Sequence, residues 1–301
     1  MAAADVSVEV PVALRTRTTA RDFLQLTKPR LSMEVLFTTA GGMWLSGQDL
    51  SATRWLATML ATAGVIGAAN TFNCYLERDS DRFMARTATR PLPGKRMDPK
   101  VALLFGFGLA IVSLPALAFG SNLLTAMLGL TALLSYVLVY TPMKARTHWA
   151  MLVGAIPGAL PPLMGWTAAT GKISAPGLAL FAILFFWQLP HFIAIALFRK
   201  EEYQRAGLTS LPLQKGDATA RRWAVIYLAC LLPVSVLPYA FNAAGLLYLV
   251  VALGLGAWFA AVGVRGWWLA LDAKWARRFF FVSLVYLTGL FAALGLDAQR
   301  Y

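Results

Sequence analysis

The sequence predicts an all-α integral membrane protein with nine transmembrane helices, and two observations lead to this fold class. First, the 301 residues are 58% hydrophobic and only 14% charged, with a mean hydropathy of +0.62. Soluble globular chains are about 45–50% apolar and about 25% charged, so disorder, a collagen-like chain and a disulfide scaffold are also excluded. Second, the apolar residues form long continuous runs, whereas the strands of a membrane barrel alternate over about ten residues. A helical bundle is the architecture that fits both.

The individual helices follow from the length of the apolar runs. A helix rises about 1.5 Å per residue, so a bilayer core of about 30 Å requires about 20 apolar residues. We expect a flexible cytoplasmic tail at 1–22 and a single membrane domain at 23–301. The first apolar run is interrupted by Glu34. The nine predicted spans are 31–47, 55–76, 101–119, 122–140, 149–169, 176–198, 223–240, 244–263 and 279–296.

The distribution of basic residues predicts the orientation. The formal net charge is +13, and 24 of the 27 Lys and Arg residues lie in the N-terminal segment or in alternate connections. Only Arg54, Lys172 and Arg300 belong to the opposite set. Because cytoplasmic loops carry the excess of Lys and Arg, the N-terminus is expected in the cytoplasm. A nucleic-acid partner is not expected, since the basic residues are scattered over short loops of one membrane face.

Two long loops, 77–100 and 199–222, fall on this cytoplasmic side. Each follows a pair of helices that begins with a K-x-R motif, Lys28-Pro29-Arg30 before the first helix and Lys144-Ala145-Arg146 before the fifth. A pattern that occurs twice in the same orientation indicates a parallel repeat, as many membrane proteins contain. Such a repeat would place both loops over one central cavity.

The first candidate site is an acidic stripe at the cytoplasmic end of the second helix. Asn73, Glu77 and Asp81 are spaced by four residues, so they share one helix face. Carbonyl and carboxylate oxygens at this spacing suit Mg²⁺, which takes one or two protein carboxylates and completes its shell with water and phosphate oxygens. Asp79 lies off the stripe. Charged residues at a solvated helix end would explain the carboxylates, but not Asn73 within an apolar run.

Basic residues near this stripe are candidates for binding a diphosphate. Arg offers a bidentate fork to phosphate and Lys a point charge. Anchoring of the cytoplasmic face would place Lys and Arg at many of the same positions, so both interpretations stay open. The candidates are Lys28, Arg30, Arg82, Arg86, Arg90, Lys144, Arg146 and Arg199.

A second candidate site closes the sixth helix. Gln188, His191, Arg199 and Glu202 are separated by three, eight and three residues, which places them on one face of a helix kinked at Pro190. Polar groups at membrane depth mark a functional site by default, although a buried histidine bonded to glutamine would serve structure equally well.

The fifth helix carries a run of glycine and proline between Gly154 and Gly165. We expect this run to break or bend the helix. Irregular backbone is tolerated at membrane depth where neighbouring helices or a cavity satisfy it, so the fifth helix is expected to line the cavity.

Taken together, these motifs resemble those of the UbiA-type intramembrane prenyltransferases, and among them the protohaem IX farnesyltransferases. The resemblance spans most of the chain and depends on the order and spacing of several short motifs. They are N-x-x-x-E-x-x-x-D at 73–81 followed by Met84 to Leu92, L-T-K-P-R at 26–30, Y-T-P-M-K-A-R at 140–146, G-A-L-P-P-L-M-G-W at 158–166, and W-Q-L-P-H-F at 187–192 with Glu202-Tyr203 and Leu211-Pro212.

The resemblance implies nine transmembrane helices around a central cavity and Mg²⁺-dependent transfer of the farnesyl group of farnesyl diphosphate to a vinyl group of haem B, with addition of water. Asn73, Glu77 and Asp81 would then hold the metal, and His191 would orient the porphyrin, ligate it or deliver the water. Gln188, Glu202 and Tyr203 would form a second metal site or contact the acceptor. This last assignment departs from the wider family, because Phe198 or Arg199 stands one turn before Glu202 where an acidic residue is usual.

Two alternatives stay open at this point. The acceptor could be a quinone precursor or a chlorin, although W-Q-x-P-H-F resembles the haem-specific enzymes. A secondary transporter would also contain repeats and polar residues at the midplane, but it gives no reason for an acidic stripe at the cytoplasmic rim. The resemblance further implies a bacterial inner membrane and a partner in haem A synthesis or oxidase assembly.

Overall fold

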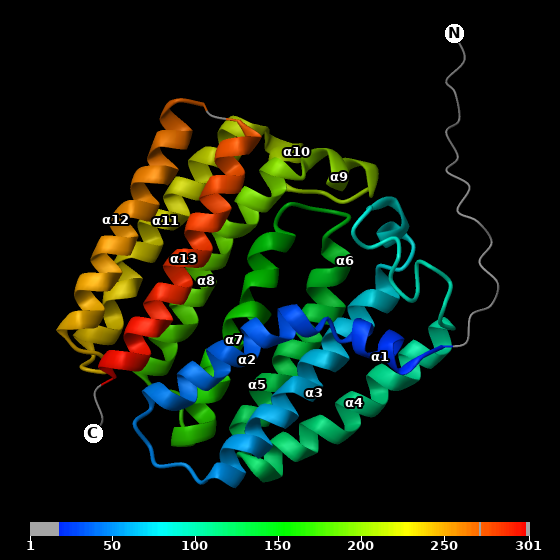
Figure 1. Cartoon of the computed structure of the whole chain (residues 1–301), viewed down its shortest axis with the longest axis horizontal. Coiled ribbons are helices and arrows are strands. Elements are labelled where there is room, and N and C mark those ends of the chain that lie inside the picture. The colour runs from blue at the N-terminus through cyan, green and yellow to red at the C-terminus, as the bar shows by residue number, and fades with distance from the viewer. Residues whose placement is uncertain (1–17, 271, 299–301) are drawn as a thin grey trace.

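The computed structural model describes residues 18–270 and 272–298 and is built from helices (Figure 1). The one extended contact in this part of the chain is an isolated bridge between Ala244 and Ala298. The helices are α1 (Ala20–Leu26), α2 (Pro29–Leu45), α3 (Ala52–Leu76), η1 (Ser80–Phe83), α4 (Pro99–Gly120), α5 (Leu123–Leu134), η2 (Ser135–Tyr140), α6 (Thr141–Met143), α7 (Ala150–Thr170), α8 (Ala175–Phe198), α9 (Lys200–Arg205), α10 (Leu211–Lys215), α11 (Asp217–Ala240), α12 (Leu246–Trp268) and α13 (Ala273–Asp297).

Eight helical segments of the described chain are long and apolar enough to cross a membrane, which confirms a multi-pass membrane protein. One of them is composite, because α5, η2 and α6 continue one another from Leu123 to Met143. The first predicted span, 31–47, corresponds to α2, which has only 17 residues and contains Glu34. The count of nine therefore stays a prediction.

Helices α7 and α8 form the centre of the bundle. In their most apolar windows 72% and 61% of the residues are buried, against 28% in α4, α11 and α12, whose outer faces are left for lipid. One hydrophobic cluster joins α8 to α11, α12 and α13, and a second joins α7 to α3, α4 and α5. The expectation that this run breaks or bends the fifth helix was wrong as to a break, because α7 continues through Pro157, Pro161 and Pro162 to Thr170. The bend stays a prediction.

A close approach of backbones fixes α2 against α7. A β-carbon added at Gly42 would lie 2.0 Å from the carbonyl oxygen of Pro162, and one at Gly165 would lie 1.9 Å from that of Thr39. Without a hydrophobic effect between helices in lipid, small residues allow the close van der Waals contact that holds such pairs together. This crossing sets the position of the start of α2, where Lys28 lies.

The connections predicted to cover the cavity lie at one end of the bundle. Figure 1 shows the segment after α3 beside α9, and the amide of Thr209, between α9 and α10, donates to the carbonyl of Lys144 at 2.8 Å. Helix α1 is attached to the same end, because Arg96 pairs with the buried Asp22 at 3.1 Å. The predicted tail boundary at 22 thus falls inside α1, and residues 1–17 of that tail lie outside the described residues.

The glycine contact predicts a position-dependent effect of added methyl groups. Gly165→Ala should lower the free energy of unfolding by about 1–3 kcal/mol, because the neighbouring atom is backbone and cannot move aside. Gly108→Ala is the matched control, since nothing lies within 4 Å of a β-carbon built there. Thermal unfolding in detergent checks both, and equal melting temperatures for the two variants would contradict the contact.

Candidate active site

The acidic stripe lies where α3 ends. The sequence predicted one continuous helix through Asp81, but α3 stops at Leu76 and Asp81 belongs to the 3₁₀ helix η1. Helical spacing is nevertheless kept beyond the end of α3. The amide of Glu77 donates to the carbonyl of Asn73 at 2.9 Å, and the amide of Asp81 donates to the carbonyl of Glu77 at 2.8 Å. The three side chains therefore stay on one face although the helix has ended.

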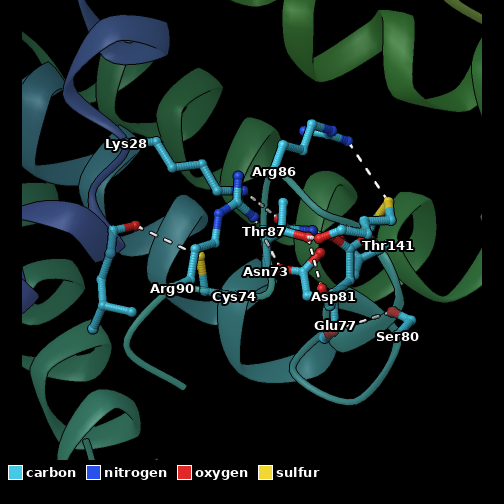
Figure 2. Close-up of polar contacts among 12 residues, drawn as sticks. Lys28, Asn73, Cys74, Glu77, Ser80, Asp81, Arg86, Thr87, Arg90 and Thr141 are labelled. Carbon is cyan, nitrogen blue, oxygen red and sulfur yellow. Dashed lines mark hydrogen bonds and ion pairs between the residues drawn. The ribbon is translucent and has the colours of Figure 1, made fainter. Parts of the chain in front are cut away.

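Each of the three side chains is held by a cation, and Figure 2 shows two of these cations, Lys28 at Asn73 and Arg90 at Asp81. The contacts are Lys28 Nζ to Asn73 Oδ1 at 2.5 Å, Lys144 Nζ to Glu77 Oε1 at 2.7 Å, and an Arg90 guanidinium nitrogen to Asp81 Oδ2 at 2.9 Å. Charge-assisted hydrogen bonds of this kind are stronger than neutral ones. The two K-x-R motifs thus meet at the stripe, each through its lysine.

Burial and charge act in opposite directions on Glu77. Burial alone would raise the pKa of its carboxyl group, but the charges of Lys144 and Lys28 outweigh burial and hold that pKa below its ordinary value. Burial lowers the pKa of the Lys28 ammonium. Glu77 is consequently an anion at neutral pH. The cations that surround it are positioned to bind a more highly charged anion as well.

Lys28 adopts an unusual backbone conformation. Its φ of 51° and ψ of 64° are left-handed, which costs a residue other than glycine on the order of 1–3 kcal/mol. The preceding carbonyl, that of Thr27, accepts hydrogen bonds from Asn70 Nδ2 at 3.0 Å and from Ser32 Oγ at 2.8 Å. The packed surroundings of Thr27 stabilise the conformation that directs the Lys28 side chain to Asn73.

These groups line a polar cavity of about 580 Å³ at this end of the bundle. Nine of the predicted site residues line it: Lys28, Asn73, Glu77, Asp81, Arg86, Arg90, Lys144, Arg199 and Tyr203. Three predicted diphosphate ligands, Arg30, Arg82 and Arg146, are exposed and do not line it. Arg82 instead lies 3.3 Å from Asp79. These three arginines lie on the surface, which favours their interpretation as anchors of the cytoplasmic face.

Glu202 joins the two long loops. Its carboxylate lies 2.6 Å from Arg199 and 3.4 Å from Arg86, which belongs to the segment after α3. The predicted polar stripe on a single helix was wrong at this point, because α8 ends at Phe198 and Glu202 stands on the separate helix α9. The side chain of Glu202 thus links two arginines that line the polar cavity, one from each long loop.

Gln188 and His191 lie elsewhere, in a deeper and mostly apolar cavity of about 310 Å³. The two cavities adjoin, since Leu31, Tyr136, Tyr140 and Phe192 line both. Gln188 lies directly against α7, where a β-carbon on Gly158 would be 2.1 Å from its Oε1. A molecule with a charged head and an apolar tail could extend from the polar cavity into the deep one.

Several residues of these cavities were missed at the level of sequence. Tyr136 and Tyr140 belong to the π-helical turn η2, and Lys144 Nζ lies 4.7 Å above the Tyr140 ring. Their spacing of four ahead of Lys144 was an available signal. Glu34 also lines the deep cavity.

A bundle of membrane-crossing helices with an acidic and cationic cavity at one end and an apolar cavity behind it is the architecture of an intramembrane prenyl-transferring enzyme. A profile described as the UbiA prenyltransferase family matches residues 35–285. The chain therefore belongs to the UbiA prenyltransferase family. This membership leaves the secondary-transporter alternative without support.

Its relatives indicate a particular branch of the family. A protein of Myxococcus xanthus named "Protoheme IX farnesyltransferase" is 61% identical over 93% of this chain and 95% of its own length. One of the same name from Sorangium cellulosum is 49% identical over 88% of this chain and the whole of its own.

Solved structures agree on the fold. A digeranylgeranylglyceryl phosphate synthase matches with a TM-score of 0.81 at 18% identity, covering 93% of this chain and 99% of that one. A UbiA homologue of Archaeoglobus fulgidus, bound to DMAPP and Mg²⁺, matches with a TM-score of 0.64 at 19% identity, covering 91% and 99%.

Proposed function

We propose that this enzyme transfers the farnesyl group of farnesyl diphosphate to a vinyl group of haem B, with addition of water, to give haem O. The observation that carries the proposal is the pairing of the cation-rich cavity with the apolar cavity behind it, in a chain whose relatives are named for this activity. The first cavity suits a diphosphate and the second a long apolar chain. Transfer to another acceptor, such as a quinone precursor or a chlorin, is the alternative reaction that the assay below must exclude.

The donor set at the end of α3 fits Mg²⁺. Asn73, Glu77 and Asp81 offer one amide oxygen and two carboxylates on one face of the polar cavity. The described chain contains no cluster of three His, Cys, Asp or Glu residues that would hold a metal by itself. Mg²⁺ accepts such a small set because water and substrate phosphate oxygens complete its shell. When bound, it would supply positive charge to the leaving diphosphate.

The cations of the chain act on the same charge. Lys28, Lys144 and Arg90 are bonded to the stripe and line the cavity, so they can move from Asn73, Glu77 and Asp81 to the oxygens of an entering diphosphate. Arg86 and Arg199 also line the cavity, and both are paired with Glu202. Negative charge grows on the diphosphate as the allylic C–O bond breaks, and these groups stabilise it most in that state.

The deep cavity protects the reacting carbon. The farnesyl group becomes cationic as diphosphate leaves, and the apolar walls exclude water that would trap it early. The haem vinyl then attacks this carbon, a water molecule adds to the cation left on the former vinyl group, and the water loses one proton. The overall change consumes haem B, farnesyl diphosphate and water, and releases diphosphate and a proton.

We also propose the location of this chemistry. Nine spans in a bacterial inner membrane are part of this proposal, and the asymmetry of basic residues supports an N-terminus and a polar cavity on the cytoplasmic side. Membrane lipid would surround the bundle. The product would pass to a haem A synthase or an oxidase assembly partner.

A reconstituted assay tests the reaction. Purified protein in detergent, given haem B, farnesyl diphosphate and Mg²⁺, should yield a more hydrophobic haem whose mass has gained a hydroxyethylfarnesyl modification, and EDTA should abolish the product. Chromatography and mass spectrometry measure it. Unchanged haem beside a prenylated aromatic acid would show that the acceptor is wrong.

The acidic stripe is tested by isosteric amides. Glu77→Gln and Asp81→Asn should each lower kcat at least about 100-fold with folding intact, because each removes a carboxylate charge from the metal-binding set. Asp79→Asn is the control, since the Asp79 side chain is 68% exposed and lies off the stripe. Turnover assays with a parallel melting curve measure both properties. Near-normal turnover in the first two variants would refute the metal assignment.

The lysine at Glu77 is expected to bind substrate. Lys144→Met should raise the KM for farnesyl diphosphate about 10- to 100-fold, because hydrogen bonds to charged groups contribute about 1.5–3 kcal/mol. Lys172→Met makes the same replacement in an exposed loop before α8 and should change KM by less than about twofold. Steady-state kinetics with varied farnesyl diphosphate measure KM for both variants. Equal KM values for Lys144→Met and Lys172→Met would contradict the role of Lys144.

A further inference from the structure

His191 is held by Ser283 of α13, a residue with no role in the mechanism described above. The Nδ1 atom of His191 and the Oγ atom of Ser283 are 2.7 Å apart, and both residues are buried. The Oγ atom of Ser283 is also 2.6 Å from the carbonyl oxygen of Phe280, one turn earlier in α13. These two contacts share one hydroxyl group.

The shared hydroxyl determines which nitrogen of the imidazole carries the proton. A serine hydroxyl has one hydrogen to donate and lone pairs with which to accept. A carbonyl oxygen can only accept, so the Ser283 hydrogen is directed to Phe280. Oγ must then accept from His191, which places the proton of the neutral ring on Nδ1. The Nε2 atom consequently carries a lone pair.

The remaining contacts fix the plane of the ring. The His191 ring stacks on Trp187 with centroids 4.7 Å apart, and Phe280 lies 4.7 Å away as well. Trp187 is itself anchored to the same serine, because its indole Nε1 donates to the Ser283 carbonyl at 2.7 Å. One residue of α13 therefore positions both the tryptophan and the histidine of the W-Q-L-P-H-F motif.

The free nitrogen faces the deep cavity. His191 lines that cavity, and Nε2 has no hydrogen-bond partner in the described chain. Nε2 is not one of the fully enclosed polar atoms that lack a partner. Part of its surface is therefore accessible within the deep cavity. An imidazole held at Nδ1 by an oxygen acceptor, with Nε2 open, is the arrangement found for histidines that bind metals.

We propose that Ser283 is a positioning residue that holds His191 as the Nδ1–H tautomer, so that Nε2 ligates the iron of the haem substrate in the deep cavity. This inference rests on the proposed function, because it requires haem to be the acceptor. The metal concerned is part of the substrate. Ligation would place the macrocycle in the same deep cavity that receives the farnesyl chain, with its vinyl group next to the reacting carbon.

Haem titration of purified variants tests the proposal. The wild-type protein should bind haem B with the absorption spectrum of an imidazole-ligated haem, and His191→Ala should lose that spectrum and regain it when imidazole is added. Ser283→Ala should raise the Kd for haem about 10-fold or more, as loss of an outer-shell partner usually does. The KM for farnesyl diphosphate should stay within about twofold. Ser283→Thr, which keeps the hydroxyl, should restore haem binding to within about threefold.

Ser235→Ala is the matched control. Ser235 is also buried and also bonds to a helix carbonyl, that of Leu231, but it contacts Tyr286 rather than His191. It should leave the haem Kd unchanged. If Ser283→Ala fails to fold, the iron–histidine stretching band of ferrous haem, measured by resonance Raman spectroscopy in the wild-type protein and in His191→Ala, still decides whether His191 is the ligand.

The outcomes separate this inference from the proposed function. No farnesylated haem from the wild-type protein would refute the function. Farnesylated haem from a wild-type protein that lacks the iron–histidine band, or an unchanged spectrum and Kd in folded Ser283→Ala, would refute the inference alone. A His191→Ala protein that binds haem normally but does not turn over would also refute it, because His191 would then act on the added water.

Discussion

The constraint on which the rest of the structure depends is the neutralisation of the carboxylates where α3 ends. Glu77 and Asp81 are largely removed from water, and a buried charge is tolerated only when it is paired. Lys144 comes from the end of α6, 67 residues beyond Glu77, and Lys28 reaches Asn73 from the start of α2, whereas Arg90 comes from the loop just beyond η1. Satisfying this charge therefore gathers segments that are separate in sequence around one cavity. The same pairs leave cations beside the place where a diphosphate and its metal would bind.

The bundle separates two chemical environments that prenyl transfer needs at a short distance. The polar cavity lies among connections at one end, whereas the deep cavity lies between helices and has mostly apolar walls. Tyr136 and Tyr140 of the π-helical turn border both. Turns of this kind occur often at functional sites because the extra residue redirects side chains. Here the turn places two aromatic rings where a charged head and an apolar chain would meet.

The polar groups next to His191 are satisfied locally, and its own Nε2 atom is left without a hydrogen-bond partner in the described chain. The hydroxyl of Ser283 is used by Phe280 and His191, and its carbonyl by Trp187. Between helices, where water is scarce, each unpaired polar group is costly. The open Nε2 of His191 is thus an exception to the pairing of the groups directly around it, Ser283 and Trp187. Such an exception is expected where a substrate, not the protein, supplies the last partner.

The sequence by itself determined the helical membrane architecture, because the length and continuity of apolar runs reflect bilayer thickness directly. It also determined the stripe of Asn73, Glu77 and Asp81, since helical spacing is a local property. Tertiary structure alone decided which basic residues reach the stripe. Lys28 and Lys144 do so while Arg30 and Arg146 of the same motifs are exposed, and spacing in the chain cannot distinguish them. Ser283 was not predictable from the sequence either, because its contact with His191 joins residues 92 positions apart and depends on how α13 packs against α8.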